Sequence, residues 1–143
     1  MTLDEIDHLP PNGFHDGLLS AIELDYKNAR ATLHLDLCVG WPDDPESERS
    51  VYQKAVVTVT GLFFCAIQPP DPNYPFVPDG SLTWLDGDPA KPDHLPSLPE
   101  LMKKAPDGTW AYRFFMGDWN SFIYIAARDA ALEWVGEKPK HAQ

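Results

Sequence analysis

Two segments in the first third of the chain alternate between apolar and polar residues, which is the period of a half-buried β-strand. The clearer segment has an apolar residue at every second position, namely Ala31, Leu33, Leu35, Leu37 and Val39. In the earlier one, Leu18, Ile22 and Leu24 share one face. Because only the short polar stretch YKNAR separates the two segments, the pattern predicts a β-hairpin.

A long run of β-branched and aromatic residues extends from Val51 to Ile67. Its other face becomes apolar after Thr60, which is typical of a strand whose end is buried on both sides, and one face is lined by the odd positions Val57, Val59, Phe63, Cys65 and Ile67. Gly61 is expected to mark a bulge or bend in the middle of this strand.

The C-terminal part alternates again in the segment TWAYRFFM, where Trp110, Tyr112, Phe114 and Met116 share one face. The next stretch, SFIYIAARDAALEWV, fits either a helix capped by Asn120 or a pair of strands. Crowding of β-branched and aromatic residues favours two strands, 122–127 and 131–135, with a turn at Arg128 and Asp129.

Between these strands, residues 69–108 hold ten of the fifteen prolines together with several Asp-Gly turn signals. Proline blocks ladder hydrogen bonds, so this Pro-rich acidic insertion is not expected to form a continuous sheet. Two short elements fit within it. Residues 81–85 suit a short edge strand, and Ser97 with Glu100 forms a capping-box pattern that predicts a helix whose Leu98, Leu101 and Met102 face the body.

Together these elements predict a mainly β protein: an antiparallel sandwich or partly open barrel of about seven or eight strands, with one short helix in the insertion. The length of 143 residues suits a single domain, 1–143. The tail, 136–143, lacks any apolar pattern and is expected to be flexible.

Charge adds an exclusion to this architecture. The chain has 22 acidic residues against 11 Lys and Arg, a formal net charge of −11. Phosphate neutralisation by Lys and Arg supplies most of the affinity for nucleic acids, and anionic membrane surfaces attract the same cations. We therefore expect no nucleic-acid partner and no membrane partner.

The N-terminal residues and the cysteines indicate the compartment. The first 26 residues contain six acids and no Lys or Arg, so no export signal is visible and a cytoplasmic location is expected. Cys38 and Cys65 each lie inside an apolar strand, where free cysteine behaves as a small hydrophobic side chain. Their spacing is not that of a metal site.

Two His–Asp pairs are candidates for chemistry. His15 and Asp16 precede the first strand and could bind a ligand together only if the backbone turns there, and turn capping by Asp16 explains the pair more simply. His34 and Asp36 lie two apart on one strand face and could supply two metal ligands, with His94 as a further candidate, although a solvent-facing polar stripe is the simpler interpretation. No nucleophile elbow or nucleotide-binding loop is present, so we assign no catalytic residues and expect no cofactor.

The aromatic residues are more distinctive. Eleven of the seventeen lie after residue 70, interleaved with acids. Tryptophan and tyrosine supply binding area and carboxylates steer association, so this composition suits recognition of a basic protein, although many of the rings must also be core. The candidate binding residues are His15, Asp16, Trp84, Asp86, Asp88 and Trp119.

The segment GFHDGLLSAIELDY resembles a group of small bacterial proteins that open with a His-Asp-small-residue motif before an amphipathic strand, some of which look like immunity proteins found near toxins. GLFFCAI and DWNSFIYIAARDAALEW are similar in character to later strands of that group. The resemblance implies a non-enzymatic binding protein for a protein partner, with His15 and Asp16 as marker positions.

Two other hypotheses remain open. The first is a small-molecule- or metal-binding β-barrel, which could be an enzyme, that uses His34, Asp36 and His15. The second is a structural role in which uncovered edge strands pair two copies as a homodimer.

Overall fold

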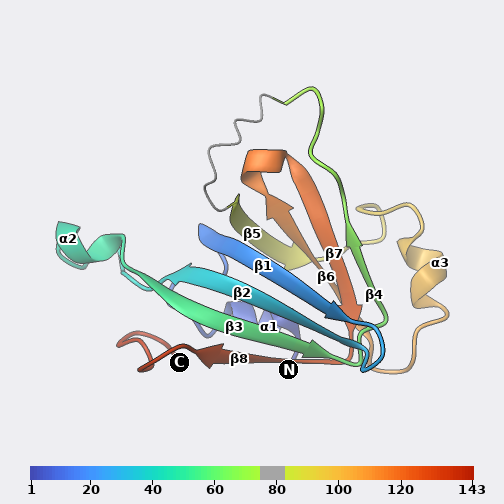
Figure 1. Ribbon diagram of the computed structural model, residues 1–143, viewed down its shortest axis with the longest axis horizontal. Coiled ribbons are helices and arrows are strands. Elements are labelled where there is room, and N and C mark those ends of the chain that lie inside the picture. The colour runs from blue at the N-terminus through green and yellow to red at the C-terminus, as the bar shows by residue number, and fades with distance from the viewer. Residues whose placement is uncertain (75–82) are drawn as a thin grey trace.

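The computed structural model describes residues 1–74 and 83–143 and contains one eight-stranded antiparallel sheet with three short α-helices (Figure 1). This confirms the predicted mainly β, antiparallel class, and the single sheet is closer to a partly open barrel than to a sandwich of two sheets. In chain order the strands are β1 (Gly17–Asp25), β2 (Arg30–Cys38), β3 (Tyr52–Thr60), β4 (Phe64–Ile67), β5 (Thr83–Pro89), β6 (Trp110–Met116), β7 (Ser121–Ala127) and β8 (Asp129–Trp134). The helices are α1 (Leu3–Asp7), α2 (Glu46–Arg49) and α3 (Leu98–Met102), with a 3-10 turn, η1 (Gly117–Trp119), between β6 and β7.

The strand order is β4-β7-β6-β5-β1-β2-β3-β8, so β4 and β8 are the two edges. The predicted hairpin of β1 and β2 is confirmed, as are the strands on either side of Arg128. β7 and β8 do not pair with each other, however: the chain bends at Arg128 instead of reversing, and β8 pairs with β3 while β7 pairs with β4.

The sheet folds over at the corner where β3 passes into β4 and β7 into β8. Gly61 has φ 62° there, and the amides of Arg128 and Phe63 donate to Thr60 and Ala126, so the pairing continues through the bend. In Figure 1, β6 and β7 stand steeply while β3 and β8 lie across the view. The predicted bend at Gly61 is confirmed.

The core fills the space enclosed by the folded sheet, and α1 closes part of it. Leu3 and Ile6 of α1 are completely buried, as is Phe14 from the turn before β1. Phe14 meets Phe114 and Tyr112 edge to face, with ring centroids 5.1 and 6.1 Å apart. The alternating faces predicted in the sequence supply most of the remaining core: Ala31, Leu33, Leu35, Leu37, Ala55, Val57, Val59, Phe114, Met116.

Helix α1 was not expected from the sequence. Thr2 and Glu5 form a full capping box, in which the Thr2 hydroxyl accepts from the Glu5 amide at 3.0 Å and the Glu5 carboxylate accepts from the Thr2 amide at 2.6 Å. At the other end of α1, Oδ1 of Asp7 accepts from the Phe14 amide at 2.6 Å, which ties the helix to the aromatic core.

Burial raises the pKa of Asp7 above its ordinary value of 3.8, and the hydrogen bond from Phe14 opposes that shift. The folded chain therefore binds this proton more tightly than the unfolded chain, so the carboxyl contributes stability that is lost as pH rises through and above 3.8. Asp7→Asn keeps an acceptor oxygen and removes the charge. We therefore expect the free energy of unfolding of the variant, relative to that of the wild type, to increase as pH rises from 3.8 to the raised pKa of Asp7. Above that pKa the difference should level off.

Urea unfolding of both proteins between about pH 3 and pH 7 measures this difference directly, because the other carboxyls titrate in both. Asp7→Ala is the control: it also lacks the charge but leaves the Phe14 amide without its partner, so it is expected to be about 1–3 kcal/mol less stable than Asp7→Asn at every pH. A relative stability of Asp7→Asn that falls with rising pH would contradict the assignment.

The Pro-rich insertion contains two of these elements. Helix α3 is confirmed and Leu98 is buried, although Ser97 makes no side-chain capping bond. β5 is not the edge strand that we predicted, because it lies between β1 and β6 and reaches Pro89. Pro89 sits at the end of β5, beyond the three residues that pair with β1, where the missing amide costs no bond to that strand. The predicted Asp79-Gly80 turn and residues 81 and 82 lie outside the described residues.

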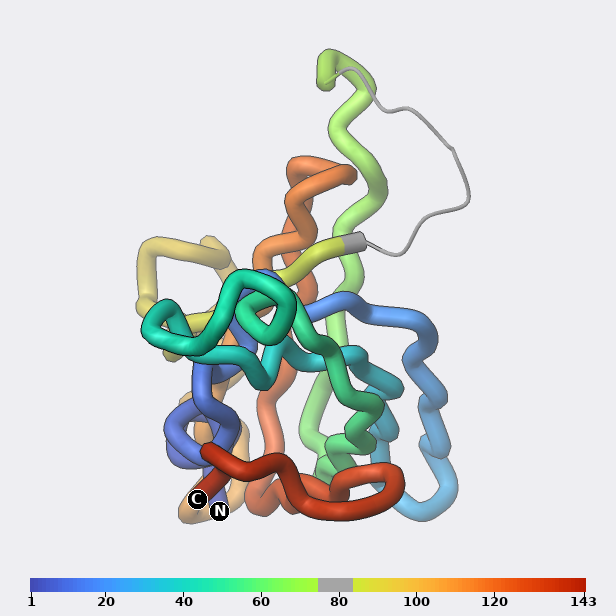
Figure 2. Tube along the Cα trace, turned by 90° about the vertical axis from the view of Figure 1, so that its left-hand side faces the viewer, coloured from blue at the N-terminus to red at the C-terminus, as the bar shows by residue number. Residues whose placement is uncertain are grey.

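Both chain ends lie in the lower part of the molecule in the two views (Figure 1 and Figure 2). The Gln143 amide donates to Leu9 at 2.9 Å, and the Ala130 amide donates to Met1. In the tail, which the sequence analysis expects to be flexible, Pro139 is buried and His141 stacks on Trp41 at 4.4 Å between centroids. His141 Nε2 also lies 3.5 Å from Oδ1 of Asp44. The pKa of Asp44 is lowered, mainly by the hydrogen bond that its carboxylate accepts from the Trp41 amide.

Cys38 and Cys65 are free thiols, and burial raises the pKa of Cys65 to about 11.

None of the helices in the described part of the chain is long and apolar enough to cross a membrane.

Candidate functional site

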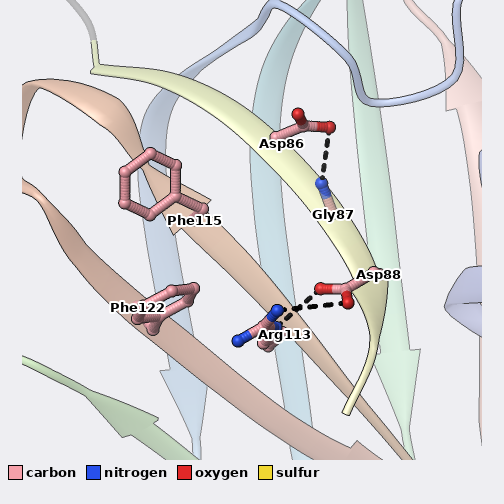
Figure 3. Close-up of a pocket in the computed structure, with 6 residues that line it drawn as sticks. All are labelled: Asp86, Gly87, Asp88, Arg113, Phe115 and Phe122. Atoms are coloured by element: carbon pink, nitrogen blue, oxygen red, sulfur yellow. Dashed lines mark hydrogen bonds and ion pairs between the residues drawn. The ribbon is translucent and has the colours of Figure 1, made fainter. Parts of the chain in front are cut away.

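A shallow pocket of about 420 Å³ lies on the outer face of β5, β6 and β7, the face opposite the core. Figure 3 shows the six residues that line this aromatic–acidic pocket: Asp86, Gly87, Asp88, Arg113, Phe115 and Phe122. Strand register explains why they meet. Asp86 is paired with Phe115 and Asp88 with Arg113, and Phe115 is in turn paired with Phe122. Side chains of paired residues point to the same side of a sheet, so all five converge.

Gly87 allows β5 to lie against the ring of Tyr112. A Cβ atom at this position would lie 2.6 Å from the hydroxyl oxygen of Tyr112, whose ring is buried in the core. Two residues of β5 thus present carboxylates outward while the residue between them leaves room for a core ring. The Tyr112 hydroxyl is buried without a hydrogen bond, and burial raises its pKa.

An ion pair crosses the floor of the pocket. Arg113 donates from Nε to Oδ1 of Asp88 at 2.7 Å and from a terminal nitrogen to Oδ2 at 3.2 Å, and its Cζ lies 4.7 Å from the centroid of the Phe122 ring. The hydrogen bond to Asp88 is the main cause that raises the pKa of Arg113. The lining residues carry two carboxylates and one guanidinium, so one negative charge, that of Asp86, has no permanent counterion among them.

The His15–Asp16 pair lies at the rim of this pocket. The backbone turns there, with Asp16 at φ 56°, so the two side chains reach the same place. His15 Nδ1 lies 3.4 Å from Oδ2 of Asp86, and His15 Nε2 lies 3.5 Å from Oδ2 of Asp16. All three side chains are at least half exposed. The structure thus brings together His15, Asp16, Asp86 and Asp88 from the predicted binding set.

The two predicted tryptophans differ in their surroundings. Trp84 is partly exposed on β5, meets Phe115 edge to face at 5.8 Å, and covers Gly117, where a Cβ atom would lie 1.8 Å from its ring. Trp84 therefore extends the aromatic surface of the pocket. Trp119 is partly buried and packs against the hydrophobic core.

Sequence reasoning missed Arg113, Phe115 and Phe122. The alternation that identifies the core face of β6 also places Arg113 and Phe115 on the opposite face, where an apolar ring beside a cation is unusual for a solvated surface. That combination is the signal that could have found the pocket.

The other His–Asp pair, His34 and Asp36, lines a separate polar pocket of about 500 Å³ on β1, β2 and β3. Its polar lining residues are Ser20, Glu23, His34, Asp36 and Lys54. His34 Nε2 is a buried atom without a hydrogen bond and lies 3.5 Å from Oε2 of Glu23. His34 and Asp36 thus share one pocket, as their spacing predicts, but His15 is not among its lining residues.

His94, the further metal candidate, is used in a turn: its Nδ1 accepts from the Lys91 amide at 3.1 Å and its carbonyl accepts from the Tyr124 hydroxyl at 2.9 Å. Within residues 1–74 and 83–143, no three His, Cys, Asp or Glu side chains are grouped so that they could hold a metal ion.

No protein-family model, curated protein or solved structure matches this chain. The resemblance of the His15–Asp16 segment to immunity-type proteins therefore stays a prediction, and the functional argument rests on the geometry described above.

Proposed function

We propose that this chain is a cytoplasmic, non-enzymatic protein that binds a basic protein partner through the aromatic–acidic pocket and its rim. The single observation that carries the proposal is the convergence of partly exposed rings with an excess of carboxylate: Phe115, which has Trp84 and Phe122 as ring neighbours, is paired with Asp86, whose charge no Lys or Arg of the pocket neutralises. Neutralisation of a toxin is the form of this function that the sequence resemblance suggests.

Each part of the surface has a physical role in such binding. Aromatic side chains bring large contact area at a small cost in conformational entropy, so they are frequent among the residues that dominate affinity. The carboxylates of Asp16, Asp86 and Asp88, within a chain of net charge −11, attract a cationic surface and speed association. The Arg113–Asp88 pair keeps the pocket in shape because both groups are already hydrogen-bonded.

The test is capture from an extract of the native host on immobilised wild type and on Asp86→Asn. We expect at least one basic protein to be retained by the wild type, to be lost from Asp86→Asn, and to elute as salt rises, because the Debye length shortens from about 10 Å at 0.1 M to about 3 Å at 1 M.

Glu133→Gln is the matched control, because it removes one charge from an exposed position on β8, an edge strand that does not contribute to the pocket. Capture that is identical on all three proteins, or that is insensitive to salt, would contradict the proposal.

The polar pocket supports a second candidate function, the binding of a small molecule. Asp36 and Lys54 are paired across β2 and β3 and line this pocket with Glu23 and His34, so it offers groups of both charges to one ligand. Such a set suits a small zwitterion. A thermal-shift screen with free amino acids tests it: a stabilising compound whose effect disappears in His34→Ala would support this candidate, and no shift with any of them would remove it.

A further inference from the structure

The chain's own Arg113 shows which cation the pocket surface accommodates. Its guanidinium makes two hydrogen bonds to one carboxylate, Asp88, and at the same time lies over an aromatic ring, Phe122. Only 22% of its side chain is exposed, so the cation is held mainly by protein groups. This side of the pocket is therefore a completed site for a guanidinium.

The neighbouring part of the pocket has the same components without the cation. Asp86 lies two residues before Asp88 on the same strand and is paired with Phe115 across β5 and β6, so the two side chains are on the same face of the sheet. The Phe115 ring is 5.2 Å from Phe122 and 5.8 Å from Trp84, so it has aromatic neighbours on two sides. Of the six lining residues, Arg113 is the one cation, and Asp88 already pairs with it. In Figure 3, the rings of Phe115 and Phe122 lie on the left and the carboxylates of Asp86 and Asp88 on the right, with Arg113 beside Asp88.

We propose that this second half of the pocket binds an arginine side chain of the partner, in preference to lysine, with its guanidinium on Asp86 and against the ring of Phe115. This inference rests on the proposed function and names the residue that the pocket recognises.

The preference for arginine follows from the shape of the guanidinium. It is planar, presents its donors as a fork that matches both oxygens of a carboxylate, and is weakly enough hydrated to lie flat on a ring. The ammonium of lysine is a compact, strongly hydrated charge that makes one such contact at a time. Asp86 has Oδ2 near His15 and accepts from the Gly87 amide with Oδ1, so its carboxylate is oriented before a ligand arrives.

Other occupants fit this surface less well. An anionic group would face two carboxylates while Arg113 is already paired, and an apolar group would cover Asp86 without replacing its water, which costs free energy. A cation that also stacks on rings satisfies both the charge and the aromatic walls.

Two blocked tripeptides, acetyl-Gly-Arg-Gly-amide and acetyl-Gly-Lys-Gly-amide, test the inference, because blocking the termini leaves the side chain as the one charge. Each is titrated at pH 7 into isotope-labelled protein, and amide shifts are followed by NMR. We expect the arginine peptide to shift Gly87 and Phe115 and to bind about fivefold more tightly than the lysine peptide, the ratio expected from an added ring contact.

The variants separate this inference from the function on which it rests. In Asp86→Asn the arginine-specific shifts should vanish, while Glu133→Gln should behave as the wild type, and the spectra themselves report that both variants are folded. Equal binding of the two peptides, lost in Asp86→Asn, would overturn the preference for arginine and leave a cation site. Absence of pocket shifts with either peptide would overturn the inference, whereas the proposed docking surface is judged separately, by whether Asp86→Asn loses the captured basic protein.

Discussion

Replacing Phe14 by alanine is expected to lower the free energy of unfolding by about 3–5 kcal/mol, the usual cost of deleting a fully buried aromatic ring. Phe14 is completely buried and contacts both Tyr112 and Phe114 edge to face, so its ring is the link between the N-terminal turn and β6. Removing the ring deletes the aromatic contacts and leaves a cavity. Because the sheet holds the surrounding strands in register, they fill that cavity only in part.

Chemical denaturation followed by circular dichroism measures this loss. Tyr26→Ala is the matched control, because that ring is 78% exposed in the turn between β1 and β2 and its removal should change stability by less than about 0.5 kcal/mol. If Phe14→Ala costs no more than Tyr26→Ala, the aromatic core has been assigned to the wrong residues.

Phe115→Ala is expected to weaken binding of the captured basic partner by about thirtyfold or more, which is the loss of a residue that dominates an interface. Phe115 lines the pocket, is paired with Asp86, and has Trp84 and Phe122 as ring neighbours. Its truncation removes the wall against which a cationic side chain would lie. Because the ring is on the outer face and only partly buried, the fold should be retained.

Isothermal titration with the purified partner measures the change, and a circular dichroism melt of the variant checks that it is folded. The Tyr26→Ala variant again provides the comparison, because it removes an exposed ring from another part of the surface. Unchanged affinity in Phe115→Ala would show that the partner uses a different face.

Alternation of apolar and polar residues predicts the strands wherever one face of the sheet is buried and the other is exposed to solvent. The burial pattern of β2 follows its sequence residue by residue, and Tyr112, Phe114 and Met116 of β6 are buried as their spacing requires. Beyond the bend at Gly61 the prediction fails, because β4 is an edge strand whose residues are at most partly buried, with Ile67 47% exposed, and not the end of a strand buried on both sides.

The misses have physical causes. Helix α1 is too short for a periodic pattern, and what holds it is the burial of Leu3 and Ile6 by strands far along the chain, although the Thr2–Glu5 capping signal was present. In β5, Gly87 and Pro89 look like turn residues, but the glycine is required by the ring of Tyr112.

The candidate site depends on topology that alternation does not contain. Composition points to Asp86 and Asp88 and a sequence motif to His15 and Asp16, and the pairing of β5 with both β1 and β6 places them together. Arg113 and Phe115 belong to the outer face of β6, whereas the alternating pattern of that strand identifies its core face. The strand order places His15 and Asp16, and not His34 and Asp36, near the rings. The sequence alone does not specify that order.

The proposed docking surface is tested most directly by a photo-crosslinking residue, benzoylphenylalanine, placed at Trp84 on the rim of the pocket and, as the control, at the exposed Tyr26. After irradiation in extract of the native host, we expect a crosslink from position 84 to a basic protein, prevented by the additional change Asp86→Asn, and no such crosslink from position 26. Crosslinks from both positions to the same proteins, or from position 26 alone, would contradict it.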